Sequence, residues 1–460
     1  MADVFDVIVM GAGPVGENVV DRAVRGGLSV AVIEAELAGG ECSYWACVPS
    51  KALLRPVDLA GEVERAPGLT VEPIDVQAVL ARRDWAVNDY SDNGQARWLE
   101  SLPSTYIRGR ARLAGEKKVE VGGRVLTARH AVVVATGSLA AIPPIPGLAE
   151  AKPWTNREAT GVKKVPGRLI VLGGGVVACE MSQALHALGA TETTMIVRRH
   201  RLLERCESFA ATMVADALAA RGIDIRFGTN IERVERTGSE VVAHLSDGTT
   251  LTADEILVAT GRRIGVDIGL ETVGLPDGRP IEVDDSMRST SLDWLYAVGD
   301  ANGRALLTHM GKYQARLCGD VIAARANRRA DDLPSMRDQA DHYGPPQVVF
   351  TDPQVGAVGI TEEEARRRGL NVRSVEYDMS GITGAYLSAD GYIGRAKAVI
   401  DEDRKVLVGV TFAAPAVAEL VHSATIAITA EVPLEKLWHA VPSFPTVSEV
   451  WLRLLETYGL

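Results

Sequence analysis

Short apolar runs alternate with segments of helical pattern through the first half of the chain. The apolar runs are residues 4–10, 28–33, 131–134, 169–172 and 194–197. Helical patterns begin after two of them, at Pro14 and at Val176. Alternation of strands with helices is typical of βαβ units on parallel sheets. The pattern therefore predicts an α/β fold.

Two glycine-rich turns follow two of these runs. They read GAGPVG at 11–16 and GGGVVA at 173–178, and each stands between a predicted strand and a predicted helix. Glycines in this context allow the backbone amides at a helix N-terminus to face a pyrophosphate. The turns stand about one domain apart, so the sequence predicts two Rossmann-like dinucleotide-binding domains in tandem.

The pattern changes after the Gly-Pro-Pro segment at 344–346. Apolar runs at 348–350, 396–400 and 406–412 each precede a helical segment, which indicates a separate α+β domain. The expected boundaries are residues 1–150 with 271–340 for the first dinucleotide-binding domain, 151–270 for the second, and 341–460 for the C-terminal domain.

Composition and charge narrow the class of protein. The chain has 460 residues, of which 47% are apolar and 24% charged, a balance typical of soluble globular proteins. A net charge of -11 argues against general nucleic-acid binding. No apolar run approaches the roughly 18 residues that a membrane span needs, and the N-terminus enters a strand pattern directly, so we expect a cytoplasmic protein without a membrane partner. Five cysteines are too few and too unevenly placed for a disulfide framework, and we expect no metal site.

Two acidic residues stand at strand ends where a bound dinucleotide would need hydrogen-bond acceptors. Glu34 ends the second strand after the first glycine turn, at the spacing of an acid that accepts hydrogen bonds from an adenosine ribose. Asp300 follows Gly299 at the end of the strand in LDWLYAVGDA, at 292–301. An acid there suits a ribityl hydroxyl, although it could equally cap a helix.

The segment GGECSYWACVPSK, at 39–51, is the most informative part of the chain. Four residues separate Cys42 from Cys47, a spacing that one distorted helical turn can bring to disulfide distance. The alternative is a pair of buried thiols or a structural bridge, which a reducing compartment would tend to open. A helix that starts here would stabilise a thiolate, and Lys51 would add positive charge one turn beyond Cys47.

This segment resembles the active-site signature of the class I flavoprotein disulfide oxidoreductases, the family of dihydrolipoamide dehydrogenase, glutathione reductase and mercuric reductase. The resemblance extends along almost the whole chain. Its further motifs are GGGVVACE at 173–180, ATGS at 135–138, ATGR at 259–262, YAVGD at 296–300 and PTVSE at 445–449. The resemblance implies an FAD-dependent enzyme that is a homodimer, with the C-terminal α+β domain as its dimerisation domain.

The resemblance also implies residue roles. Cys47 would be the thiol that forms a charge-transfer complex with FAD, and Cys42 the thiol that attacks the substrate. Lys51 would lie near the flavin N5 atom and pair with Glu180. A buried lysine with such a partner can remain charged and would favour the reduced flavin anion.

The second glycine turn differs from the first at the end of the next strand. Where Glu34 stands in the first unit, the second has Arg198, followed by Arg199 and Arg201, with no acid at the ribose position. Guanidinium groups favour a 2′-phosphate. The sequence therefore predicts NADPH in preference to NADH.

The chain departs from the family at its expected acid/base. The family has a His-Pro-Thr segment with a glutamate a few residues on, whereas this chain has Phe444 before Pro445, and Glu449 remains. A gapped alignment puts Val441 at the same place, and neither side chain can move a proton. His439 lies close in sequence and could take the role, although a histidine beside a tryptophan is more often a packed surface residue.

The expected site residues form two sets. The catalytic set is Cys42, Cys47, Lys51, Glu180, Glu449 and His439. The cofactor-binding set is Gly11, Gly13, Pro14, Gly16, Glu34, Gly40, Glu41, Cys42, Lys51, Ala111, Ala135, Thr136, Gly137, Gly173, Gly175, Val176, Val177, Glu180, Arg198, Arg199, Gly261, Gly299, Asp300, Leu307 and Thr308.

Three functions fit these residues. In the first, electrons pass from NADPH through FAD to the Cys42–Cys47 disulfide and on to a disulfide or other thiol-reactive acceptor, metal ions included. In the second, a quinone or other small acceptor is reduced directly at the flavin. The third is a redox sensor in which the cysteine pair acts as a switch and turnover is incidental.

Overall fold

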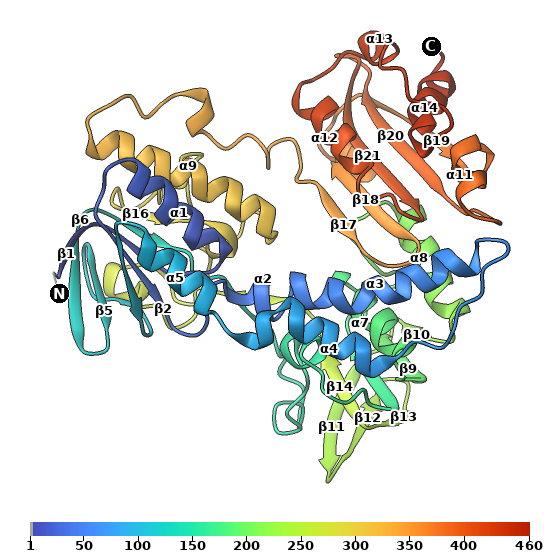
Figure 1. Cartoon of the computed structure of the whole chain (residues 1–460), viewed down its shortest axis with the longest axis horizontal. Helices are drawn as coiled ribbons and strands as arrows, with labels where there is room; N and C mark the ends of the chain where they lie inside the picture. Colours follow the sequence, from blue (N-terminus) through green and yellow to red (C-terminus); the bar gives the residue numbers. More distant parts are fainter. Residues whose placement is uncertain (1–2) are drawn as a thin grey trace. The chain divides into compact units, whose positions relative to one another are not determined.

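The computed structural model describes residues 3–460 of the chain. They divide into two compact units, and each is described by itself (Figure 1). Unit 1 consists of the residues up to Pro49, Asp84–Ala141 and Arg262–His342; unit 2 consists of Ser50–Arg83, Ile142–Gly261 and Tyr343–Leu460. The three domain boundaries expected from the sequence stay predictions.

Unit 1 is built on a mainly parallel sheet. In sheet order the strands are β3 (Ser104–Arg108), β2 (Val30–Glu34), β1 (Val4–Met10), β6 (Arg124–Val134), β5 (Lys118–Val121) and β4 (Arg112–Leu113), with β16 (Leu295–Ala297) parallel to β6. Helices α1 (Pro14–Arg25) and α9 (Thr308–Ala326) lie side by side (Figure 1). The glycine turn that joins β1 to α1 therefore lies at the carboxyl end of a central strand, where open α/β sheets bind ligands.

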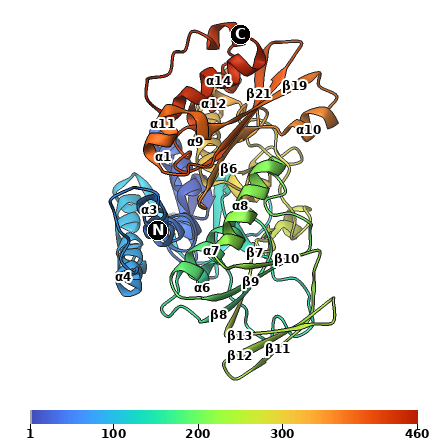
Figure 2. The same cartoon turned by 90° about the vertical axis from the view of Figure 1, so that its right-hand side faces the viewer.

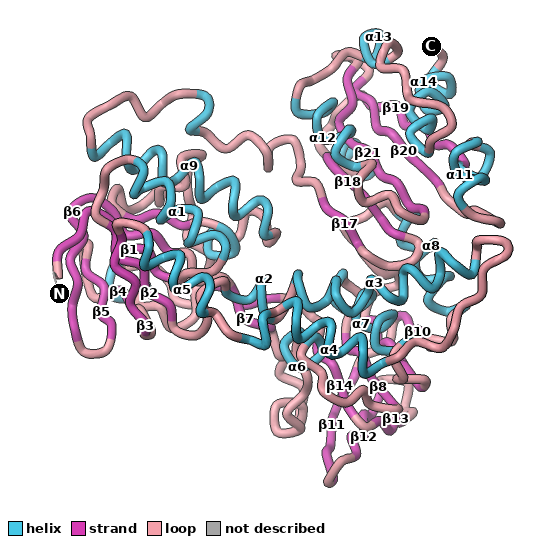
Figure 3. The backbone as a smooth tube through the Cα atoms, in the orientation of Figure 1, coloured by secondary structure: helices cyan, strands magenta, loops and turns pink. Residues whose placement is uncertain are grey.

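Unit 2 contains the second glycine turn, between strand β8 (Arg168–Leu172) and helix α7 (Val176–Ala187). The parallel sheet has the order β10 (Asp224–Phe227), β9 (Glu192–Val197), β8 and β14 (Glu255–Val258), and a second, antiparallel sheet consists of β11 (Ile231–Thr237), β12 (Glu240–Leu245) and β13 (Thr250–Ala253). Figure 3 distinguishes these strands from the helices around them.

The C-terminal part of unit 2 is a five-stranded antiparallel sheet with helices. Its order is β17 (Gln347–Val349), β18 (Gln354–Gly359), β21 (Val406–Ala414), β20 (Arg395–Asp401) and β19 (Val372–Asp378). All nine residues of β21 are buried, because sheet neighbours flank the strand on both sides and α12 (Val421–Thr429) packs against it. The predicted α+β character of this part is confirmed, but only the run at 406–412 leads into a helix, because β17 and β20 each pair with the strand that follows them.

A helical hairpin follows the cysteine segment. It consists of α3 (Cys47–Glu64) and α4 (Val76–Ala86), which lie side by side in Figures 1 and 2. Leu53 and Leu54 of α3 and Leu80 of α4 belong to the same buried cluster as Leu185 of α7. This shared apolar core explains why residues 50–83 group with unit 2.

The remaining helices and strands, apart from the 13-residue helix α8, are short. They are α2 (Gly40–Tyr44), α5 (Asn93–Ser101), β7 (Ser138–Ala140), α6 (Asn156–Thr160), α8 (Ser208–Ala220), β15 (Arg262–Ile264), α10 (Glu362–Arg367), α11 (Thr383–Ser388), α13 (Leu434–Leu437) and α14 (Val450–Tyr458). Within residues 3–460, none of the helices combines the length and the apolar character that crossing a membrane requires.

Candidate functional site

The first glycine turn is shaped by close backbone contacts. Gly11 has φ +103°, and a Cβ atom on it would lie 2.4 Å from the carbonyl oxygen of Ala135. A Cβ atom on Gly16 would lie 1.9 Å from the carbonyl oxygen of Gly11. Only glycine fits at these positions, and the turn leads directly into the N-terminus of α1, as a pyrophosphate site requires.

Glu34 is held by two backbone amides. Its Oε2 atom accepts a hydrogen bond from Ala12 N, inside the glycine turn, at 2.8 Å, and its Oε1 atom accepts one from Glu36 N at 2.8 Å. Each carboxylate oxygen can accept two hydrogen bonds. The side chain is therefore fixed at the end of β2 with acceptor capacity left for a ribose hydroxyl.

Asp300 lies at the end of a chain of polar contacts in unit 1. Ser138 Oγ donates to Asp300 Oδ2 at 2.5 Å and accepts from Arg262 Nε at 2.9 Å, while Arg262 Nη2 donates to the carbonyl oxygen of Ser138 at 2.6 Å. The residue before it, Gly299, has φ +64°. The contact of Ser138 with Asp300 was not predicted from the sequence, because the two residues are 162 positions apart in the chain.

The two cysteines lie on different helices. Cys42 belongs to α2, whereas Cys47 is the first residue of α3, so the helix interruption at Trp45 separates them instead of one distorted turn. Their side chains form a hydrogen bond, and this contact together with burial raises the pKa of the Cys42 thiol. Both are free thiols in the structure.

The cysteine pair has an unequal environment. Cys47 Sγ lies 3.4 Å from Thr308 Oγ1, at the start of α9. Cys47 begins α3, so it lies at the helix N-terminus that is expected to stabilise a thiolate. The contact with Cys47 and burial favour the protonated form of Cys42 and raise its pKa.

Aromatic residues that the sequence analysis did not select anchor the cysteine segment. Tyr44 is buried, and its hydroxyl donates to the carbonyl oxygen of Ala38 at 3.1 Å and to Gln95 Oε1 at 3.2 Å. Trp45 stacks on Tyr90 with ring centroids 4.6 Å apart. These contacts fix the residues between the two cysteines. No spacing in the sequence predicts these contacts.

Lys51 and Glu180 form the ion pair expected from the sequence. Lys51 Nζ lies 2.7 Å from Glu180 Oε2, and Glu180 Oε1 accepts a hydrogen bond from Phe350 N at 3.0 Å. Lys51 Nζ also lies 4.9 Å from the centre of the Phe350 ring. Glu180 is buried, so both of its oxygens need the partners that they have.

The second glycine turn repeats the first in detail. Gly173 has φ +132°, and a Cβ atom on it would lie 2.4 Å from the carbonyl oxygen of Ala259. Ala135 and Ala259 each begin an Ala-Thr-Gly motif. In both units the amide of this alanine donates to a backbone carbonyl oxygen at the end of the strand that leads into the glycine turn, that of Met10 or of Leu172. The two motifs therefore support the two glycine turns in the same way.

The arginines after β9 are accessible. Arg198 and Arg199 directly follow the strand and are exposed, and Arg199 Nε lies 3.4 Å from Glu204 Oε2. An exposed surface ion pair of this kind contributes little and can be exchanged for a phosphate. The guanidinium groups are therefore accessible to a ligand, and the preference for NADPH stays a prediction.

In the C-terminal segment, the residues at or near the position of the family's acid/base histidine are exposed to solvent. Phe444 is 73% exposed and Val441 84% exposed, and His439 is exposed as well. Glu449 is 7% exposed; its Oε1 atom pairs with Arg453 Nη2 at 2.5 Å, and its Oε2 atom is buried without a hydrogen-bond partner among the described residues. Within residues 3–460 of one chain, no hydrogen bond joins His439 to Glu449.

An open pocket of about 580 Å³ lies in unit 1, between α1 and α5. It is lined by Glu17, Asn18, Asp21, Arg25, Gly94, Gln95 and Trp98. Burial raises the pKa of Glu17 to about 7. This pocket could not be predicted from the sequence, because its residues come from two helices and show no motif.

Family models cover most of the chain. The model of the pyridine nucleotide-disulphide oxidoreductases matches residues 5–315, and the model of the dimerisation domain of the same family matches residues 345–454. The chain therefore belongs to the pyridine nucleotide-disulphide oxidoreductase family. Members of this family are enzymes that bind FAD and a pyridine nucleotide, and the recognition made from the sequence motifs is confirmed.

Individual relatives span nearly the whole chain. It is 32% identical to dihydrolipoyl dehydrogenase of Thermus scotoductus, over 98% of this chain and 97% of that protein. It is 27% identical to mercuric reductase of Staphylococcus aureus, over 97% of this chain and 81% of that protein. Among solved structures it is similar to the Cu(II) complex of RclA, an HOCl-induced flavoprotein disulfide reductase of Escherichia coli, with a TM-score of 0.85, 23% identity and 99% coverage of both chains.

Proposed function

We propose that the chain passes electrons from NADPH through FAD to the Cys42–Cys47 disulfide and on to a disulfide or other thiol-reactive acceptor. The observation that carries this proposal is the direct contact between two thiols, of which Cys47 begins helix α3 and Cys42 has a pKa that this contact and burial raise. Two inert buried thiols would need no such arrangement. The glycine turns at 11–16 and 173–178 fit the two dinucleotides, because their backbone leaves no room for side chains at Gly11 and Gly173.

When bound, FAD supplies the hydride acceptor and the reductant for the disulfide. The rest of the chemistry belongs to the chain. After reduction, the Cys42 thiolate attacks one sulfur of an acceptor disulfide and releases the first thiolate. Cys47 then attacks the Cys42 sulfur, releases the second thiolate and restores the Cys42–Cys47 disulfide. One NADPH and one proton are consumed for each acceptor disulfide that becomes two thiols.

Cofactor preference follows from the second unit. Arg198 and Arg199 lie exposed at the end of β9, where an acid would bind the ribose of NADH. We assign them to the 2′-phosphate of NADPH. We also propose a cytoplasmic location. It follows from the lack of a long apolar run in the sequence and from the reducing chemistry assigned to the cysteines.

A homodimer is proposed from the C-terminal domain. It matches the family's dimerisation domain, and large apolar side chains are exposed on it, namely Leu387, Ile393, Ile426, Val441 and Phe444. Apolar exposure of this extent indicates an interaction surface. Light scattering at micromolar concentration should give twice the mass of the chain, and a monomer would contradict the assignment.

Phe444 favours a second candidate function. A phenyl ring cannot accept the proton released in disulfide exchange, but in the place of the family's histidine it would suit flat aromatic acceptors such as quinones. Replacing Cys42 and Cys47 by serine separates the two functions. Disulfide reduction should vanish in the double variant under the first proposal, while quinone reduction directly at the flavin should survive. If disulfide reduction survives, the first proposal is wrong.

A further inference from the structure

A buried amide lies behind the turn that carries Asp300. Gln314, in the second turn of α9, has no exposed surface. Its Oε1 atom accepts hydrogen bonds from Gly299 N at 3.0 Å and from Asn302 Nδ2 at 2.9 Å. One side-chain oxygen therefore holds both ends of the turn at 299–302.

The other end of this amide faces a buried acid. Gln314 Nε2 donates to Asp338 Oδ2 at 3.5 Å, and Asp338 is only 1% exposed. Two hydrogen bonds to the backbone fix Asp338. Its amide donates to the carbonyl oxygen of Asp285 at 2.8 Å, and its Oδ1 atom accepts from Ala340 N at 3.0 Å. Asp338 thus fixes which way the Gln314 amide points.

Charged groups surround Asp338. Arg304 Nε lies 2.6 Å from Asp341 Oδ2, and Arg304 Nη2 lies 2.8 Å from Asp285 Oδ1. His342 Nε2 also lies 3.2 Å from Asp285 Oδ1. Burial and the nearby Asp341 raise the pKa of Asp338, and Arg304 opposes this effect. The backbone amide of Arg304 in turn donates to Asn302 Oδ1 at 3.0 Å, so this cluster connects back to the turn.

We infer that Gln314, oriented by Asp338, is the positioning residue for the flavin-binding turn at Gly299 and Asp300. The inference rests on the proposed flavin site at these two residues. Ser138 holds the Asp300 side chain from one side, and Gln314 holds the preceding amide from the other. A neutral amide is required, because it accepts from two N–H groups with its oxygen while it donates to a carboxyl with its nitrogen.

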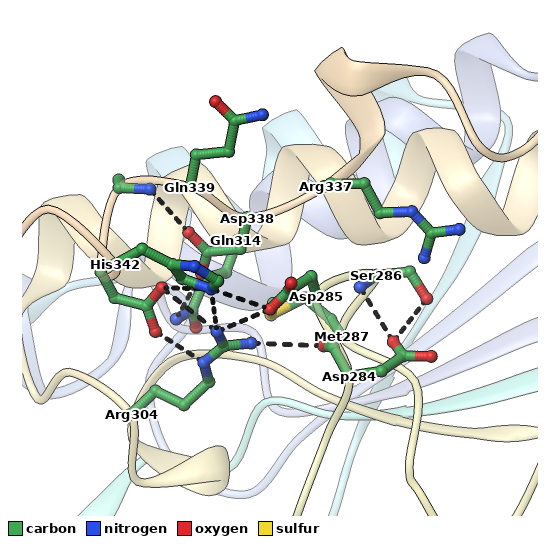
Figure 4. Close-up of polar contacts among 12 residues, drawn as sticks. Asp284, Asp285, Ser286, Met287, Arg304, Gln314, Arg337, Asp338, Gln339 and His342 are labelled. Atoms are coloured by element: carbon green, nitrogen blue, oxygen red, sulfur yellow. Dashed lines mark hydrogen bonds and ion pairs between the residues drawn. The ribbon is translucent and has the colours of Figure 1, made fainter. Parts of the chain in front are cut away.

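Two substitutions separate positioning from general packing. Gln314→Leu removes both functions of the amide at similar size. Gln314→Glu keeps the acceptor but places a second carboxyl against Asp338, so the contact needs a proton. The matched control is Gln339→Ala, because Gln339 is exposed and points away from the network (Figure 4).

The measurement is FAD binding to the full-length apoprotein, followed by flavin fluorescence, with circular dichroism of the same samples. We expect Gln314→Leu to raise the Kd for FAD about 10-fold or more, the scale set by the loss of buried hydrogen bonds. The Gln314→Glu variant should bind nearly normally at about pH 5 and lose affinity steadily toward about pH 8, while wild type and the Gln339→Ala control show no such slope.

The Asp300→Ala variant tests the proposed flavin site separately from the positioning role of Gln314. If Asp300→Ala binds FAD as tightly as wild type, both the proposed flavin site and the inference are wrong. If Asp300→Ala loses FAD but the Gln314→Glu variant binds it like wild type at every pH, the flavin site stands and the inference is overturned. The Gln314→Glu variant tests the positioning role even if Gln314→Leu does not fold, because a purely structural role of Gln314 predicts no dependence of the FAD affinity on pH.

Discussion

Lys51 Nζ lies 2.7 Å from Oε2 of Glu180, and the other oxygen of this carboxylate accepts a hydrogen bond from Phe350 N. The pair joins α3, which begins at Cys47, to α7, which begins at the second glycine turn. The ion pair fixes the position of the Lys51 side chain, which is expected near the flavin in the proposed mechanism.

Glu180→Gln should slow flavin reduction by NADPH about 10- to 100-fold, the scale of one lost charge-assisted hydrogen bond. The fold should persist, because the glutamine oxygen can still accept from Phe350 N. Stopped-flow absorbance of the flavin measures the rate. The exposed Glu456 provides a control, Glu456→Gln, which should react like wild type. Equal rates in all three proteins would remove Glu180 from the mechanism.

Alanine at the first glycine of each turn should remove one dinucleotide at a time. Gly11→Ala should yield protein without FAD, and Gly173→Ala should keep FAD but bind NADPH at least about 10-fold more weakly, since each added Cβ atom meets a carbonyl oxygen at 2.4 Å. Flavin absorbance and nucleotide titration measure the two effects. Gly94→Ala is the matched control, because a Cβ atom there meets nothing within 4 Å.

The arginines after β9 should set the choice of nucleotide. Wild type should have a lower KM for NADPH than for NADH. The double substitution Arg198→Ala with Arg199→Ala should raise the KM for NADPH about 10-fold or more and leave that for NADH nearly unchanged, because only the 2′-phosphate needs the guanidinium groups. Steady-state kinetics with both nucleotides measure this. Equal KM values in the wild type would refute the assignment.

Disulfide turnover should rise with pH. The contact with Cys47 and burial raise the pKa of Cys42, and only the thiolate attacks a disulfide. A larger thiolate fraction at higher pH should therefore increase kcat with a disulfide acceptor between about pH 7 and about pH 9. Initial flavin reduction by NADPH, measured in parallel, should lack this slope. A flat profile for disulfide turnover would show that Cys42 is not the attacking thiol.

The sequence predicted the fold and the family because both depend on local patterns. The glycine turns, the strands before them and the Cys42–Cys47 segment are contiguous, and their spacing follows from backbone geometry. Even there, the strand expected at 28–33 is Val30–Glu34, and one expected helical turn is two helices interrupted at Trp45. Boundaries of this kind depend on tertiary contacts.

The contacts that position the site could not be predicted in the same way. Gln314 meets Asp338 and Gly299, and Ser138 meets Asp300, only because the chain folds back over long separations. Lys51 and Glu180 were expected as a pair through the family motif, although 129 residues separate them. Gln314 is an amide in a helix with no motif around it, so nothing in its sequence neighbourhood distinguishes it from a surface residue.

The most direct test of the central claim is an anaerobic titration of the FAD-loaded protein with NADPH, followed by absorbance. If Cys42 and Cys47 form a redox-active disulfide, the protein should take up about two equivalents of NADPH per flavin, with a long-wavelength charge-transfer band after the first. The double serine variant should take up about one equivalent without that band. Uptake of about one equivalent by the wild type would contradict the assignment of Cys42 and Cys47 as the redox centre.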